Sequence, residues 1–67
     1  MKGEIKMLKA KDLQNSVWAD NTGDFMEVSK IQGGWIAYAN KFSLEAKTAK
    51  ELQTKIKEAG FTHLGWD

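Results

Sequence analysis

The stretch from Gly33 to Gly60 limits the possible folds most, because it joins the pattern of a β-hairpin directly to that of an amphipathic helix. In its second half, apolar residues recur at spacings of three and four, so they share one face of a helix with 3.6 residues per turn. Polar residues fall on the opposite face. The apolar set is Ala49, Leu52, Ile56 and Ala59, and the polar set is Lys50, Thr54 and Lys57.

The ends of this helix are also marked. Thr48, followed three residues later by Glu51, is a capping box, in which the hydroxyl accepts from a free backbone N–H and the carboxylate reaches back. Gly60 suits the left-handed position that commonly ends a helix. The sequence therefore predicts a helix over about residues 48–59.

Short β-prone segments precede the helix. Phe42–Ala46 alternates apolar and polar residues, as a strand with one buried face does. Trp35–Ala39 is rich in strand-forming residues, and Asn40-Lys41 is a plausible tight turn between the two. Upstream, the predicted strands are Phe25–Ile31 and Val17–Ala19, separated by a turn at Asp20–Asp24.

The two ends of the chain each fit two structures. We expect a first strand within Met1–Ala10 with Ile5 and Met7 inward, although Met1, Ile5 and Leu8 also fit a short helical face. A turn is expected at Lys11–Gln14, and Phe61–Trp66 is expected to lie extended against the helix or a sheet edge. The prediction is thus a single α+β domain over residues 1–67, a small curved antiparallel sheet of about five strands within residues 4–46 packed by one C-terminal helix.

Composition narrows the class of protein. The 67 residues contain no cysteine, and they show no leader pattern and no apolar run of membrane-spanning length. We therefore expect a cytoplasmic protein without membrane contact, metal or cofactor. The net charge is +1, but the first eleven residues carry four lysines and one glutamate, whereas residues 12–27 carry four acids and no base. Charge patches of both signs are expected.

No residue pattern indicates catalysis. His63 is the only histidine and has no neighbouring metal ligands, and Ser43, His63 and Asp67 lack the context of a catalytic triad. Asp20, Asp24 and Glu27 surround a turn. They are read as hydrated turn residues, with a partner-facing acidic patch as the alternative. The sequence predicts a non-enzymatic protein.

The tryptophans are the main binding candidates. If Val17, Ile36 and Tyr38 face the core, strand alternation turns Trp18 and Trp35 outward, where they can stack on bases or anchor a protein interface. The alternative is that sheet curvature or the C-terminal tail buries them. Lys47, Lys50 and Lys57 lie on the polar side of the helix, as a solvated face or as a contact for phosphates or an acidic protein.

Two resemblances accompany these patterns. Lys9–Leu13, Val17–Ala19, the turn at Gly23 and Glu27–Ile31 together resemble the start of small SH3-like β-barrels, which implies an SH3-like half-barrel. The second half, with Trp35, Phe42, Thr48 and Glu51-Leu52, resembles the hairpin and helix of arm-type DNA-binding domains of integrases and short host-takeover proteins of phages. No functional residue is carried over from either resemblance.

These observations favour a small binding module of the phage or mobile-element type that modulates or inhibits a host protein by docking on it. The partner-binding candidates are Trp18, Trp35, Lys47, Lys50 and Lys57. Nucleic-acid binding through lysines and stacked tryptophans is the alternative function. A homodimer through an exposed sheet edge is a third possibility.

Overall fold

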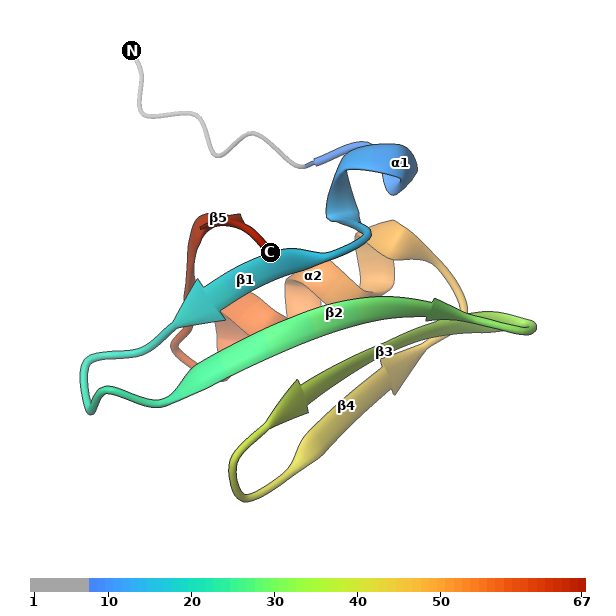
Figure 1. The fold of residues 1–67 in the computed structure, drawn as a ribbon. Coiled ribbons are helices and arrows are strands. Elements are labelled where there is room, and N and C mark those ends of the chain that lie inside the picture. Colours follow the sequence, from blue (N-terminus) through green and yellow to red (C-terminus); the bar gives the residue numbers. More distant parts are fainter. Residues whose placement is uncertain (1–7) are drawn as a thin grey trace, which may run out of the picture.

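The computed structural model describes residues 8–67, which form one antiparallel sheet of five strands with a helix packed on one face (Figure 1). The strand order is β4-β3-β2-β1-β5, and the sheet does not close into a barrel. The predicted α+β class is confirmed, while the SH3-like assignment remains a prediction. The elements are α1 (Ala10–Leu13), β1 (Ser16–Ala19), β2 (Phe25–Ile31), β3 (Gly34–Ala39), β4 (Ser43–Ala46), α2 (Ala49–Glu58) and β5 (Thr62–Trp66).

Strands β1 to β4 form a meander in which each strand pairs with the next. The turn between β1 and β2 is built by Asp20, whose Oδ1 accepts from the backbone N–H of Thr22 (2.9 Å) and of Asp24 (3.0 Å). The Thr22 hydroxyl donates to the same oxygen and is the main cause that lowers the pKa of Asp20. Gly23 completes the turn with φ of 91°. The predicted turn is confirmed, because its residue types build it locally.

The C-terminal segment supplies the fifth strand. Helix α2 carries the chain from β4 to the opposite edge of the sheet, where β5 pairs with β1. Val17 lies opposite Gly65, and Trp18 lies opposite His63, so Leu64 has no partner residue and forms a bulge. Of the two predicted places for this segment, the structure selects the sheet edge.

The structure tests only part of the prediction for the N-terminal residues. Most of the strand expected in Met1–Ala10 lies outside the described residues. At its described end, Ala10 begins the helical turn α1, which continues to Leu13 across the region where a simple turn was expected. The sheet therefore has its fifth strand from the C-terminal segment, and no strand precedes β1 in residues 8–67.

Helix α2 agrees closely with the predicted helix. The Thr48 hydroxyl accepts from the Glu51 backbone N–H (3.1 Å), and Gly60 has φ of 93°. The buried face of α2 differs from the predicted one at one position, because Ala59 is exposed and Gln53 is buried instead. The Gln53 amide bonds both backbone groups of Leu8, at 2.7 and 2.8 Å, and this pairing satisfies a buried polar group that the apolar pattern could not anticipate.

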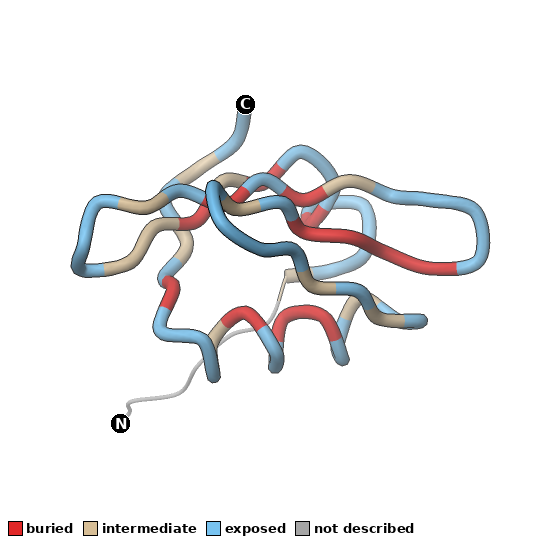
Figure 2. Tube along the Cα trace, turned by 90° about the horizontal axis from the view of Figure 1, so that it is seen from below, coloured by how far each residue is buried: buried red, intermediate tan, exposed pale blue. Residues whose placement is uncertain are grey.

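The core lies between the sheet and α2 (Figure 2). Of the two placements considered for the tryptophans, the structure has the buried one, with Trp18 2% and Trp35 5% exposed, whereas Tyr38 is 55% exposed. On β4 the predicted side, with Leu44 and Ala46, packs against the core, whereas on β1 and β3 the tryptophan side is the one that α2 covers. Burying the larger rings removes more apolar surface from water. The core residues are Leu13, Trp18, Met26, Val28, Trp35, Ala37, Leu52, Ile56 and Phe61.

The buried indole of Trp18 is also satisfied as a donor. Its Nε1 donates to the Ser16 hydroxyl (2.9 Å), which donates in turn to the Leu13 carbonyl (2.6 Å). Tryptophan is buried at low cost where its N–H has such a partner. This chain of bonds fixes α1 against the start of β1.

Candidate interaction surface

The face of the sheet opposite α2, here called the outer face, is not covered by any element of residues 8–67 (Figure 1). Its side chains are those that alternate with the core residues along each strand. Phe25 is 56% and Tyr38 is 55% exposed, and both border the same groove, so they form a patch and are not singly exposed residues. The main residues of the outer face are Val17, Phe25, Glu27 and Tyr38, with Asp67 directly after β5, while Ile36 points to the same side but is only 7% exposed.

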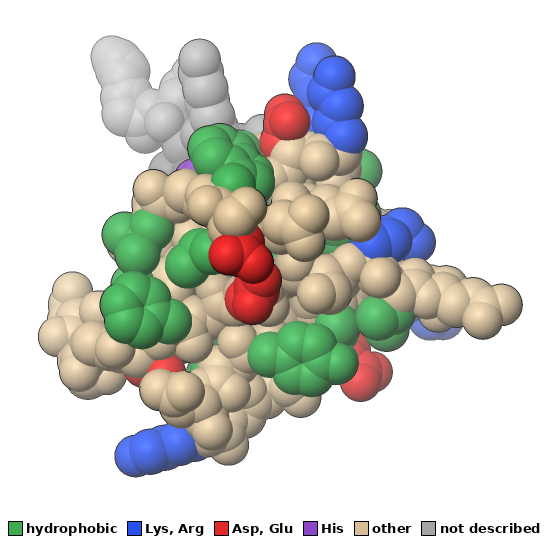
Figure 3. Space-filling model, in the orientation of Figure 1, with side chains coloured by type: hydrophobic (Ala, Val, Ile, Leu, Met, Phe, Trp, Pro, Cys, Tyr) green, Lys and Arg blue, Asp and Glu red, His purple; other side chains and the backbone are tan. Residues whose placement is uncertain are grey.

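A groove of about 330 Å³ brings aromatic and acidic residues of this face together. The register places Glu27 between Val17 on β1 and Tyr38 on β3, so a carboxylate stands in the middle of an apolar row. In Figure 3, hydrophobic side chains surround the acidic side chains near the centre of the face. The groove is lined by Val17, Phe25, Met26, Glu27, Tyr38, Ala39, Asn40 and Asp67.

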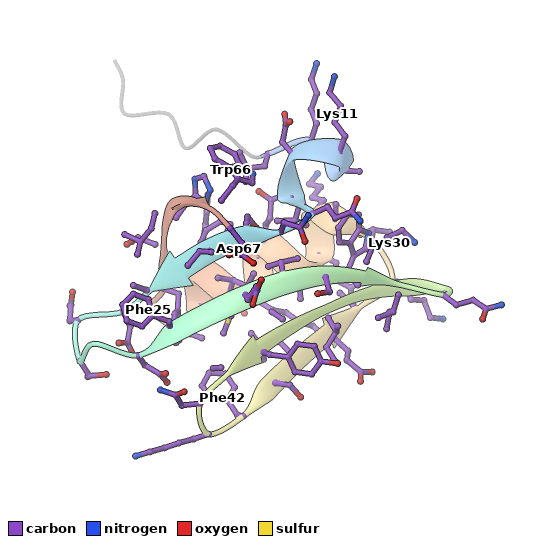
Figure 4. The ribbon with its side chains drawn as sticks, in the orientation of Figure 1. Lys11, Phe25, Lys30, Phe42, Trp66 and Asp67 are labelled. Carbon is purple, nitrogen blue, oxygen red and sulfur yellow. The ribbon has the colours of Figure 1, made fainter. Side chains whose placement is uncertain are left out.

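Asp67 reaches the groove because the end of β5 is hydrogen-bonded to α1 and to the loop between α1 and β1. Its backbone N–H donates to the Asn15 carbonyl (2.9 Å), and the Trp66 indole donates to the Asp12 carbonyl. Asn15 has φ of 66°, a left-handed conformation that asparagine tolerates better than most residues. Figure 4 shows Asp67 over the sheet and Trp66 beside α1. The groove therefore brings Glu27 and Asp67 together, although they are forty positions apart in the chain.

The carboxylates of Glu27 and Asp67 act on each other. Asp67 raises the pKa of Glu27 above its ordinary value, first because the protonated Glu27 carboxyl can hydrogen-bond to the Asp67 carboxylate and then because two ionised carboxylates repel each other. None of the outward positions of the five strands carries a lysine that could offset this repulsion. Asp24, which lines a different hollow, accepts from the backbone N–H of Phe25 (2.9 Å). The centre of the outer face is thus negative and its surroundings are apolar.

The structure places the binding residues predicted from the sequence on the α2 side of the sheet, away from the outer face. Trp18 and Trp35 are in the core, so neither offers an open ring face for stacking. Lys47 and Lys50 are exposed and Lys57 is half-buried, and all three lie in or just before α2, on the other side of the sheet. Trp18 shares the lining of one hollow with Lys57, and Trp35 shares that of another with Lys47, but both rings are buried, so neither has the exposure that stacking on bases requires.

Sequence reasoning missed Phe25, Tyr38 and Asp67 as surface candidates. The signal for Phe25 was present, since Met26 and Val28 alternate with it and are good core residues. Using that signal required knowing which side of the sheet α2 covers. Asp67 carries no local signal, because its place depends on β5 pairing with β1. Glu27 was anticipated only as part of the alternative acidic patch.

His63, the histidine considered in the sequence, is engaged within the fold. His63 packs against the rings of Trp18 and Trp66, at 5.1 and 4.5 Å between centroids, and its Nε2 lies 3.0 Å from the Gly65 carbonyl oxygen. No group of three or more potential metal ligands occurs in this part of the chain. Neither of its helices has the length and apolar character needed to cross a membrane.

A second hollow, of about 470 Å³, lies between the end of α2 and β5. It is bordered by Leu8, the first described residue, and its lining includes the core residues Trp18 and Phe61. The charged residue at its rim is Lys57. This hollow lacks the exposed aromatic residues that distinguish the outer face.

Comparison of the chain with protein-family models, with curated protein sequences and with solved structures finds no match.

Proposed function

We propose that this chain is a small non-enzymatic binding module that docks on a partner protein through the outer face and acts as its modulator or inhibitor. The observation that carries the proposal is the groove on the outer face, where Phe25 and Tyr38 remain more than half exposed. Tyrosine and other aromatic side chains are typical anchors of protein interfaces, because they bury a large area at a small cost in side-chain entropy.

The charge of the outer face supports a protein partner over a nucleic acid. Glu27 and Asp67 stand in the groove, and phosphates would be repelled there. The exposed lysines Lys47 and Lys50 lie away from the exposed aromatic rings of this face, so the stacking and phosphate contacts that the alternative function needs are not combined in the groove. Nucleic-acid binding is therefore the second outcome of the test.

The test is selection of short random peptides from a display library, with the purified protein immobilised at neutral pH. The wild-type protein is expected to enrich a set of related peptides. The double variant Phe25→Ala/Tyr38→Ala should lose them, because it removes both anchors. Phe42→Ala is the matched aromatic control, since the Phe42 ring packs edge-on against the core residue Phe61 (6.0 Å between centroids) and should keep the selected peptides.

A failed selection, or peptides that bind the double variant equally well, would reject docking through the outer face. Titration with single- and double-stranded oligonucleotides at low salt tests the alternative, and the exposed Trp66 serves as a fluorescent reporter. Binding that weakens steeply with salt and is lost on replacing Lys47, Lys50 and Lys57 with alanine would establish the nucleic-acid function instead.

A further inference from the structure

The outer face has a distribution of charge that restricts what can cover it. Its apolar side chains come from β1, β2 and β3, while Glu27 and Asp67 place two carboxylates inside the groove that these side chains border. Glu45 on β4 adds another acid at an outward position, and the lysine of β2, Lys30, lies on the opposite side with its Nζ 5.5 Å from the centre of the Trp35 ring. The outward positions of the described strands therefore have no positive charge.

A second copy of this chain is a poor occupant at neutral pH. A symmetric face-to-face dimer uses the same patch on both copies, so Glu27 and Asp67 of one copy would approach those of the other. Like charges brought together in an interface oppose association, and here no outward-facing lysine compensates them. Anionic lipid head groups and nucleic-acid phosphates meet the same opposition.

We infer that the outer face recognises a protein segment that carries a lysine or arginine side chain flanked by apolar residues, with the cation received between the Glu27 and Asp67 carboxylates and the rings of Phe25 and Tyr38. This inference rests on the proposed function and names the chemistry of the partner. A cation next to two carboxylates relieves their mutual repulsion, and aromatic ring faces attract cations as well. The flanking apolar residues would cover the exposed parts of the two rings.

The peptide selection described above also tests this inference. The selected peptides are expected to be enriched in lysine or arginine at one position, with apolar residues on both sides. In a synthetic peptide of the selected sequence, replacing that residue with methionine should weaken binding about fivefold, as expected for an ion pair that stays partly hydrated. Glu27→Gln/Asp67→Asn in the protein should weaken binding of the parent peptide by a similar factor.

Two controls make the result specific. The protein and peptide substitutions should not be additive, because each removes the same contact, which a double-mutant cycle measures. Glu58→Gln, at the end of α2, is the charge-matched control and should leave binding unchanged. Binding to the wild-type protein should also weaken with added NaCl, and this dependence should be smaller for the carboxylate variant.

Enrichment of purely apolar peptides, with no effect of Glu27→Gln/Asp67→Asn, would overturn the inference while leaving the proposed function intact. Enrichment of no peptides would remove the proposed function itself. Sedimentation at neutral pH tests the remaining occupant. A wild-type dimer that Tyr38→Ala dissociates would show that a second copy covers the face, and the inference would then be wrong.

Discussion

The two faces of the sheet are built from the same strands and both carry aromatic side chains, but one face is buried and the other is exposed to solvent. The inner face buries Trp18 and Trp35 under α2, and the Trp18 indole donates to the Ser16 hydroxyl. The outer face leaves Phe25 and Tyr38 in solvent around charged carboxylates. Aromatic residues therefore stabilise this protein on one face and remain available for contacts on the other.

This difference shows that residue type alone does not reveal which aromatic positions serve the fold. A strand places alternate residues on opposite faces, and only the layer packed on the sheet decides which set becomes the core. The following changes test the difference between the two faces, from the largest expected effect to the smallest.

Trp18→Ala should destabilise the protein by about 3–5 kcal/mol, because it leaves a large cavity in the core. A domain of this size has little more stability than that, so the variant is expected to be largely unfolded. Tyr38→Ala on the outer face should change the free energy of unfolding by less than about 1 kcal/mol. Urea denaturation followed by circular dichroism measures both, and similar losses for the two variants would contradict the assignment of the faces.

Gln53→Leu should cost about 1–3 kcal/mol, although leucine has a similar size and is apolar. The change removes the partners of the Leu8 N–H and C=O groups. Thr54→Ala, the exposed neighbour on α2, should stay within about 0.5 kcal/mol of the wild type. The direct readout is hydrogen exchange at the Leu8 amide, which should become faster in Gln53→Leu only. Unchanged protection of that amide would show that the glutamine contributes nothing on the covered side.

Glu27→Gln should have the smallest effect, and of the opposite sign, because it stabilises the protein at neutral pH. The pKa of Glu27 is raised in the folded state, so the folded protein opposes its ionisation, and this penalty is present above the folded pKa. As the pH falls below the ordinary value of 4.5, glutamate is protonated in both states and the advantage of the variant should disappear. Melting temperatures measured across this pH range test the sign.

Asp67→Asn, combined with Glu27→Gln, completes a double-mutant cycle for this prediction. It removes the same repulsion from the other side, so it should also stabilise at neutral pH, and the double variant should gain no more than either single variant. Additive gains would mean that the two carboxylates do not act on each other.

Local patterns predicted much of the fold. The hydroxyl of Thr48 and the backbone of Gly60 define α2, and Asp20 and Gly23 build the turn before β2, because each of these effects depends on residues within one turn of chain. The candidate surface was much less predictable. Its carboxylates come together only after β5 has paired with β1. Because they are far apart in the sequence, no local pattern predicts that they are neighbours.

By itself, the sequence determined the extent of α2 and the turns that join β1 to β2 and β3 to β4, since these follow from neighbouring residues. The tertiary structure alone decided which side of the sheet α2 covers, and so placed Trp35 inside and Tyr38 outside. The physical reason is that alternation divides side chains into two sets without ranking them. The choice between the sets depends on the apolar area that packing against α2 removes from water, to which every element of the domain contributes.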